Sequence, residues 1–318
     1  MPAGTAAAKD TAVVLLFLGT IKKGSYYDPR KKGDMIGEFE YVRVDSITEG
    51  CSLLAEHAGS AAVLAGGTDL LVNIRNGTAS PSLLVDFKRI EELKVFFPDK
   101  GMIGSSVLLN VIAEDRIVRD RYRGLAEAAQ DVGSYQIRNR ATLAGNLCNA
   151  SPAADTAPPL FVLDAHVTIA GPHETRTLPV QDLFVGVKKN ALSPSEVIVS
   201  INLPPALPQV RTKFLKIQRI RGHDLAIINM AGYLDIASGE LRIAIGSCAV
   251  TPILLPSLDE PVDEDASIDE LVEKLNALAQ SAIAPISDLR GSAEYRRAMV
   301  PVLLRKLLVA LLSPQEGE

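Results

Sequence analysis

The chain has 318 residues, of which 47% are hydrophobic and 22% charged, and its formal net charge is −5 at pH 7. This length suggests two domains, and the hydrophobic fraction is sufficient to fill their cores. The acidic balance argues against nucleic acid as a partner, since a nucleic-acid-binding surface needs a clustered basic excess.

Cysteines and histidines are few and scattered. Cys51, Cys148 and Cys248 have no CxxC partner, and the four histidines show no metal-binding spacing. This pattern predicts no disulfide framework and no metal held by this chain. It is typical of buried thiols in a reducing compartment, so we expect a cytoplasmic protein.

Residues 1–37 are interpreted as an extension before the first domain. Their apolar run, residues 12–18, is much shorter than the ~20 residues of a membrane span. The run resembles a signal-peptide core, but Lys9 is offset by Asp10 and no cleavage motif follows before Lys22. We therefore expect neither a membrane span nor a secreted protein.

The first organised region begins at residue 38 with a helix signal. Ser46, followed three residues later by Glu49, forms a capping box and predicts a helix to about His57. The apolar run 61–64 stops at two glycines, which predicts a buried strand ending in a loop. Further short strands are expected at 83–87, 93–97 and 102–103.

Asn110 is expected to cap a helical region that extends to Val132, and another helix is expected at 157–163. Later elements are strands at 166–170, 197–203 and 213–219, a hairpin of 226–235 with 241–245, and helices at 267–283 and 296–312. The proline-rich segment 203–208 is the best internal boundary, because prolines stiffen a connection and supply no ladder donors. Pro301 is expected to kink or restart the last helix.

The order of these elements predicts an α+β fold. Strands occur in groups and do not alternate strictly with helices, which argues against a doubly wound parallel sheet. We expect an extension at 1–37, a first domain at 38–208 and a second domain at 209–318.

The first of two donor-rich loops is Leu64-Ala65-Gly66-Gly67-Thr68-Asp69-Leu70. Adjacent glycines after a strand leave bare backbone N–H groups, which can form a nest for phosphate, and Thr68 adds a hydroxyl donor. A lone pair of glycines is more often an ordinary tight turn, so this loop alone does not establish a binding site.

The second loop contains Thr142, Gly145 and Asn146 and ends at Asp155. Asp155 can accept hydrogen bonds from sugar hydroxyls or cap the helix that follows, and the residues alone leave both roles open. The chain has no GxGxxG and no P-loop motif. Two donor-rich loops without a lysine are better suited to the diphosphate that joins the two halves of a dinucleotide than to a triphosphate.

Together these residues resemble the FAD-binding subunit of the molybdenum hydroxylase family, which includes xanthine dehydrogenase. The matching segments are AGGTDLL at 65–71, TLAGNLCNASPAAD at 142–155 and KIQRIRGHDLA at 216–226. The match looks closest to the 4-hydroxybenzoyl-CoA reductase branch, but the cysteine-rich iron–sulfur loop of that branch is missing after Cys148. Ala144 replaces the usual first glycine of GGN, and its methyl group is expected to narrow the approach of a ligand to the backbone at that position.

The resemblance implies a two-part FAD-binding domain of the vanillyl-alcohol-oxidase type, followed by a C-terminal α/β domain. The diphosphate and ribityl chain of FAD would be held by Leu64, Ala65, Gly66, Gly67, Thr68, Asp69, Leu70, Thr142, Gly145 and Asn146. Asp155 would bind a sugar or ribityl hydroxyl. Ile198 would pack on the isoalloxazine ring, and Lys216 would lie near its polar edge, where a cation stabilises the anionic reduced flavin.

The same resemblance implies an electron-transfer subunit with no substrate chemistry of its own. Its partners would be a molybdenum-cofactor large subunit and a [2Fe–2S] small subunit in a dimer of heterotrimers, and an external acceptor would exchange electrons with the flavin. One alternative is a self-contained FAD-dependent reductase of the same binding fold, although no convincing serine or glutamate proton donor is visible. Another is a scaffold subunit that has lost FAD, which only Ala144 supports.

Overall fold

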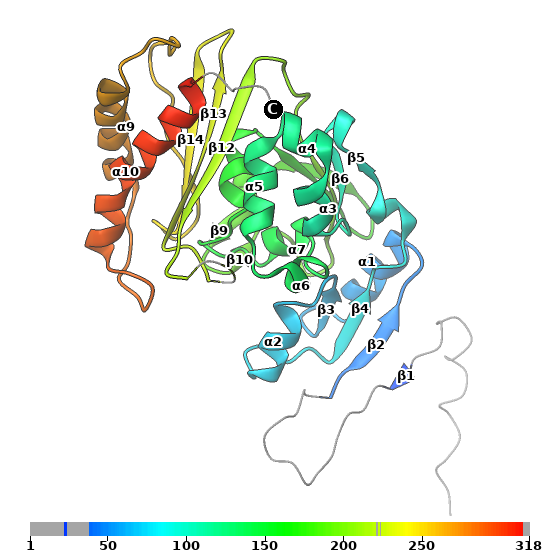
Figure 1. Ribbon diagram of the computed structural model, residues 1–318. Helices are drawn as coiled ribbons and strands as arrows, with labels where there is room; N and C mark the ends of the chain where they lie inside the picture. The colour runs from blue at the N-terminus through cyan, green and yellow to red at the C-terminus, as the bar shows by residue number, and fades with distance from the viewer. Residues whose placement is uncertain (1–21, 24–37, 221, 223, 314–318) are drawn as a thin grey trace, which may run out of the picture.

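The computed structural model describes residues 22–23, 38–220, 222 and 224–313 (Figure 1). The apolar run at 12–18 and most of the expected extension lie outside these residues. Of the extension, the described part contains only the short strand β1 (Lys22–Lys23).

A small four-stranded sheet forms the first part of the molecule, in the order β1-β2-β4-β3. Its members β2 (Glu40–Arg43) and β3 (Ala61–Leu64) both run parallel to β4 (Leu83–Asp86). Because β3 lies at the edge of the sheet, its residues are only partly buried, so the expectation of a buried strand at 61–64 was wrong.

Two helices accompany this sheet, α1 (Ile47–Glu56) and α2 (Leu70–Arg75). Ser46 caps α1 as expected, since its Oγ accepts a hydrogen bond from the Glu49 backbone N at 3.2 Å. The Glu49 carboxylate accepts from the backbone N of Asp45, one residue before the expected partner. The capping signal therefore located the start of the helix correctly.

The second part is built on a five-stranded antiparallel sheet in the order β5-β6-β11-β7-β8. Its strands are β5 (Phe96–Phe97), β6 (Met102–Gly104), β7 (His166–Ala170), β8 (Thr175–Pro179) and β11 (Val197–Asn202). The strand expected at 93–97 is wrong over its first half, because Glu91–Lys94 forms a 3-10 turn.

Six short helices belong to this second part: α3 (Leu109–Glu114), α4 (Arg116–Arg121), α5 (Arg123–Asp131), α6 (Tyr135–Arg138), α7 (Leu143–Cys148) and α8 (Ala157–Val162). Asn110 does not cap α3 but lies inside it, where its Nδ2 donates to the carbonyl of Tyr135 at 3.0 Å. A two-stranded hairpin, β9 (Phe184–Gly186) with β10 (Lys189–Asn190), lies beside the end of α7.

The C-terminal sheet is antiparallel and follows chain order: β12 (Val210–Ile217), β13 (Ile228–Asp235), β14 (Glu240–Gly246) and β15 (Ile253–Leu254). Helices α9 (Ile268–Ala282) and α10 (Ala293–Leu312) pack together, with α10 on one face of this sheet, while α5 and α8 of the preceding part contact its strands (Figure 1). All eight residues of β13 are buried as a result. The two domains therefore share an extensive apolar interface.

Helix α10 continues through Pro301, so it does not restart there as the sequence suggested. Proline cannot donate to the carbonyl four residues earlier, which belongs to Arg297. That carbonyl instead accepts a hydrogen bond from Gln280 Nε2 of α9 at 3.1 Å. The neighbouring helix thus satisfies the group that the proline leaves unpaired.

Candidate cofactor-binding site

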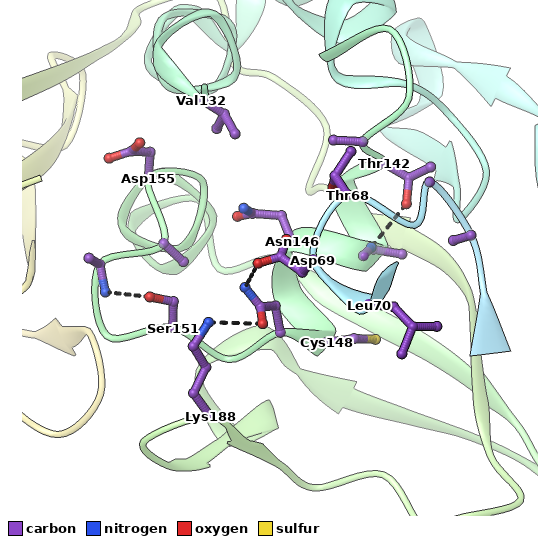
Figure 2. A pocket seen from close by; sticks show the side chains of 18 of the residues that line it. Thr68, Asp69, Leu70, Val132, Thr142, Asn146, Cys148, Ser151, Asp155 and Lys188 are labelled. Atoms are coloured by element: carbon purple, nitrogen blue, oxygen red, sulfur yellow. Dashed lines mark hydrogen bonds between the residues drawn. The ribbon is translucent and has the colours of Figure 1, made fainter. Parts of the chain in front are cut away.

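A cavity of about 830 Å³ lies between both glycine loops, the hairpin β9–β10 and loops of the second domain (Figure 2). This volume falls in the usual range for a small-molecule site, roughly 300–1,000 Å³. All the residues proposed from the sequence as FAD contacts line it, with the exception of Leu64 and Lys216. The fold thus brings together two loops that are separated by more than seventy residues in the sequence.

The first glycine loop reaches the cavity with its backbone. Gly67 has φ +75°, a conformation that favours glycine, and a Cβ placed on Gly66 would lie 2.1 Å from the carbonyl oxygen of Arg140. Within the described part of the chain, the backbone N–H groups of residues 66–69 have no hydrogen-bond acceptor. The loop is therefore close-packed against Arg140 and keeps free backbone donors in a segment that lines the cavity, as a phosphate-binding nest requires.

The second loop presents side chains more than backbone amides. Thr142 Oγ1 caps α7 by accepting from Gly145 N at 3.0 Å, so the Gly145 amide is already used and the hydroxyl hydrogen remains to donate (Figure 2). Asn146 Oδ1 accepts from Thr156 Oγ1 at 2.7 Å, which fixes the amide and leaves its NH₂ group as a donor. Ala144 also lines the cavity, although it is only 5% exposed and packs in the core.

Asp155 and Lys216 meet each other across the domain boundary. Lys216 Nζ lies 2.7 Å from Asp155 Oδ2 and 3.0 Å from the carbonyl of Asp131, and Asn229 Nδ2 donates to Asp155 Oδ1 at 2.8 Å. Helix α8 begins after Thr156 without a side-chain cap, so Asp155 is not acting as its cap. Asp155 lines the cavity, whereas Lys216 lies behind it with its side chain 2% exposed.

Burial raises the pKa of Asp155 to about 6, against the opposing effects of Lys216 and Asn229. A carboxyl group with this pKa changes charge near neutral pH. It can present either an acceptor or a donor to a ligand hydroxyl in the cavity.

Several cavity residues were missed by the sequence reasoning because they carry no local motif. Glu196 is held by two hydrogen bonds from Arg176, at 2.7 and 2.9 Å, which lower its pKa to about 2. Lys188 occupies the turn of the hairpin and faces Asn149 (Figure 2). A lysine in a hairpin turn is a usual surface residue, so only the folded arrangement reveals its place at the cavity.

The second domain closes one side of the cavity. Its contributions include Leu225, Val250 and Ile286, which are exposed apolar side chains, and the charged Arg290 and Arg296. Arg296 is 1% exposed and donates to the carbonyls of Ile227 and Ser247 at 2.8 and 2.7 Å. This wall is thus stabilised by a buried arginine that ties three segments together.

The described residues offer neither a metal-binding cluster nor a membrane-spanning helix. They contain no group of three or more His, Cys, Asp or Glu side chains suited to a metal ion. No helix among residues 38–220 and 224–313 is long and apolar enough to cross a membrane.

Two family models cover nearly all of the described chain. Residues 37–206 match the FAD binding domain in molybdopterin dehydrogenase, and residues 213–311 match the CO dehydrogenase flavoprotein C-terminal domain. The chain therefore belongs to the family of FAD-binding proteins of the molybdopterin dehydrogenases. The fold class expected from the sequence and the family resemblance are thereby confirmed, while the closer likeness to the 4-hydroxybenzoyl-CoA reductase branch stays a prediction.

Curated relatives and solved structures agree with this assignment. The carbon monoxide dehydrogenase medium chain of Hydrogenophaga pseudoflava is 31% identical over 86% of this chain and 96% of its own length. The xanthine dehydrogenase FAD-binding subunit of Escherichia coli is 28% identical over 87% and 97%. A crystal structure of the Hydrogenophaga pseudoflava carbon monoxide dehydrogenase superposes with a TM-score of 0.82, at 29% identity, over 87% of this chain and 98% of that one.

The cavity fits the FAD that this family binds. Free N–H groups in the first loop, the Thr142 hydroxyl and the Asn146 amide supply donors for a diphosphate. Ile198, 4% exposed, offers an apolar surface, and Asp155 offers a partner for a hydroxyl. Polar donors and apolar walls in one cavity are what a flavin dinucleotide requires.

Proposed function

We propose that this chain is the FAD-binding electron-transfer subunit of a multi-subunit molybdenum-containing hydroxylase or dehydrogenase. The proposal rests on one observation: both glycine loops line the same cavity, in a chain whose two domains match the family models. Bound FAD would supply the exchange of electrons between one-electron and two-electron carriers.

The chain's own residues would bind and orient that cofactor non-covalently, with one FAD in each chain. The loop at 64–70, with Thr142 and Asn146, would hold the diphosphate and ribityl chain. Ile198 would contact the isoalloxazine ring. Lys216 would act on the flavin through Asp155, since the two side chains are paired and Asp155 is the member that reaches the cavity.

The proposed partners are a molybdenum-cofactor large subunit and a [2Fe–2S] small subunit in the cytoplasm, assembled as a dimer of heterotrimers. Relatives named as a medium chain and an FAD-binding subunit support this organisation. An external electron acceptor would complete the path. The self-contained reductase is not favoured, because relatives that match along almost their whole length are subunits of larger enzymes.

Purification of the chain with its natural partners tests the proposal. We expect three kinds of subunit in equal ratio, with molybdenum, iron and one FAD for each copy of this chain. Acid precipitation should release the flavin into the supernatant as FAD. A stable monomer that reduces an organic substrate by itself, or a complex without flavin, would contradict the proposal.

A further inference from the structure

A chain of hydrogen bonds crosses the cavity between three loops. Lys188 Nζ donates to Asn149 Oδ1 at 2.9 Å, and Asn149 Nδ2 donates to Asp69 Oδ1 at 2.8 Å (Figure 2). All three residues line the cavity. The lysine thus lies opposite the first glycine loop, with a neutral amide between its ammonium group and the nearest carboxylate.

Lys188 differs from the other cations that line the cavity in having no carboxylate partner among the described residues. The others are ion-paired: Lys88 with Asp86 at 2.8 Å, and Arg290 and Arg296 with Asp288 at 2.6 and 2.7 Å. An amide satisfies one ammonium hydrogen but does not neutralise the charge. The positive charge of Lys188 therefore remains available to an anion in the cavity.

The backbone around Lys188 is held in place by the second glycine loop. Lys188 N donates to the carbonyl of Ala150 at 3.0 Å, and Asn190 Nδ2 donates to the carbonyl of Cys148 at 2.7 Å. Lys188 itself has φ +57° and Ala150 has φ +43°, conformations that non-glycine residues rarely adopt. Such backbone strain persists where surrounding contacts enforce it, and it occurs often at ligand-binding sites.

We propose that Lys188 binds the diphosphate of FAD and supplies the positive charge that the two glycine loops lack. The ammonium group would exchange its neutral amide partner for a phosphate oxygen, which is a charge-assisted hydrogen bond. Asn149 would keep its bond to Asp69 and so hold that carboxylate away from the anion. The inference rests on the proposed FAD site and adds a residue to it.

A diphosphate could also belong to a dinucleotide acceptor that docks on the flavin. The free N–H groups of residues 66–69 favour the cofactor itself, since lysine and loop then act on the same anion. The two sources are separable by experiment, because FAD binds to the flavin-free chain whereas an acceptor binds to the chain already loaded with FAD.

The test is a titration of the flavin-free full chain with FAD and, separately, with riboflavin, which has no phosphate. Lys188→Gln should weaken FAD binding about tenfold or more and make it less sensitive to salt, with riboflavin binding unchanged. Lys188→Arg should restore most of the affinity. Lys189→Gln, at the exposed neighbouring position outside the cavity, should behave as wild type.

Lys188→Gly separates binding from folding. Glycine adopts positive φ without strain, so this variant should be at least as stable as wild type while binding FAD as weakly as Lys188→Gln. Unchanged FAD affinity in both variants would overturn the inference, as would an equal loss for riboflavin or a loss confined to the binding of NAD+, as a dinucleotide acceptor, by the FAD-loaded chain. Failure of the wild-type chain to bind FAD would instead remove the proposed function.

Discussion

Lys216 Nζ lies 2.7 Å from Asp155 Oδ2, and the two side chains are only 2% and 6% exposed. Asp155 belongs to the glycine loop of the first domain, whereas Lys216 lies on β12 of the second. The pair therefore joins the two domains directly behind the cofactor cavity. It makes the stability of the domain interface and the charge of the cavity wall depend on the same two groups.

Removing the lysine should destabilise the chain strongly, because it leaves a buried carboxylate without its counter-charge. For Lys216→Met we expect a loss of about 3 kcal/mol or more in the free energy of unfolding at pH 7.5. Lys213→Met is the matched control on the same strand, since Lys213 pairs with Glu127 at a site that is about one quarter exposed. That variant should lose about 1 kcal/mol or less. Urea denaturation gives both values, and equal losses would contradict the special role of the buried pair.

The raised pKa of Asp155 predicts a pH dependence of stability. Between pH 4 and 6 the folded chain retains a proton that the unfolded chain has released, so the contribution is full below pH 4 and is lost as pH rises through 6. Asp155→Asn imitates the protonated form. The unfolding free energy of wild type minus that of Asp155→Asn should fall by about 3 kcal/mol from pH 3 to pH 7. A constant difference, measured on the flavin-free chain, would show that the pKa is ordinary.

The positive φ at Gly67 predicts loss of FAD binding in Gly67→Val. A β-branched residue cannot adopt φ +75° without strain, and its Cβ would lie 3.1 and 3.2 Å from side-chain carbons of Leu64 and Leu71, so the loop that carries the free N–H groups would have to shift. Gly77→Val is the control, because Gly77 has φ +71° with nothing within 4 Å of an added Cβ and lies outside the cavity. Both variants should lose about 1–2 kcal/mol of stability, but only Gly67→Val should fail to bind FAD. Wild-type affinity in Gly67→Val would remove this loop from the site.

Iron should be absent from the purified subunit. Cys148 keeps the position after Asn146 and Leu147, but the described chain continues directly to Asp155, and Cys51 and Cys248 lie buried in other parts of the fold. Three separated thiols do not supply the four ligands of a [4Fe–4S] cluster. Elemental analysis of the isolated chain checks the prediction, and stoichiometric iron with a cluster-type absorbance would refute it.

Signals that act over a few residues were read correctly from the sequence. The capping box at Ser46 located α1, and the glycine pair located the loop that reaches the cavity. Features that depend on residues far away in the sequence were predicted wrongly. Pro301 fits inside α10 because Gln280 bonds the freed carbonyl, and strand β3 is partly exposed because it lies at a sheet edge.

The candidate site also contains residues that the sequence predicts and residues that it does not. Both glycine loops have recognisable composition, but Lys188 and Glu196 have no local pattern, since their place at the cavity depends on the hairpin β9–β10 and on Arg176. Lys216 does not itself line the cavity but pairs with Asp155, which does, so its expected place near the flavin stays a prediction. Sequence reasoning identifies residues with functional chemistry, whereas the packing decides which of them reach the ligand.

Electron transfer into the flavin of this chain tests the central claim most directly. The FAD-loaded chain would be mixed without oxygen with its iron–sulfur partner subunit, reduced beforehand, and the flavin absorbance followed by stopped flow. The proposed function predicts rapid bleaching of the oxidised flavin in the complex, and much slower bleaching when the chain is mixed with an unrelated reduced iron–sulfur protein. A flavin that stays oxidised while the reduced partner is bound would contradict it.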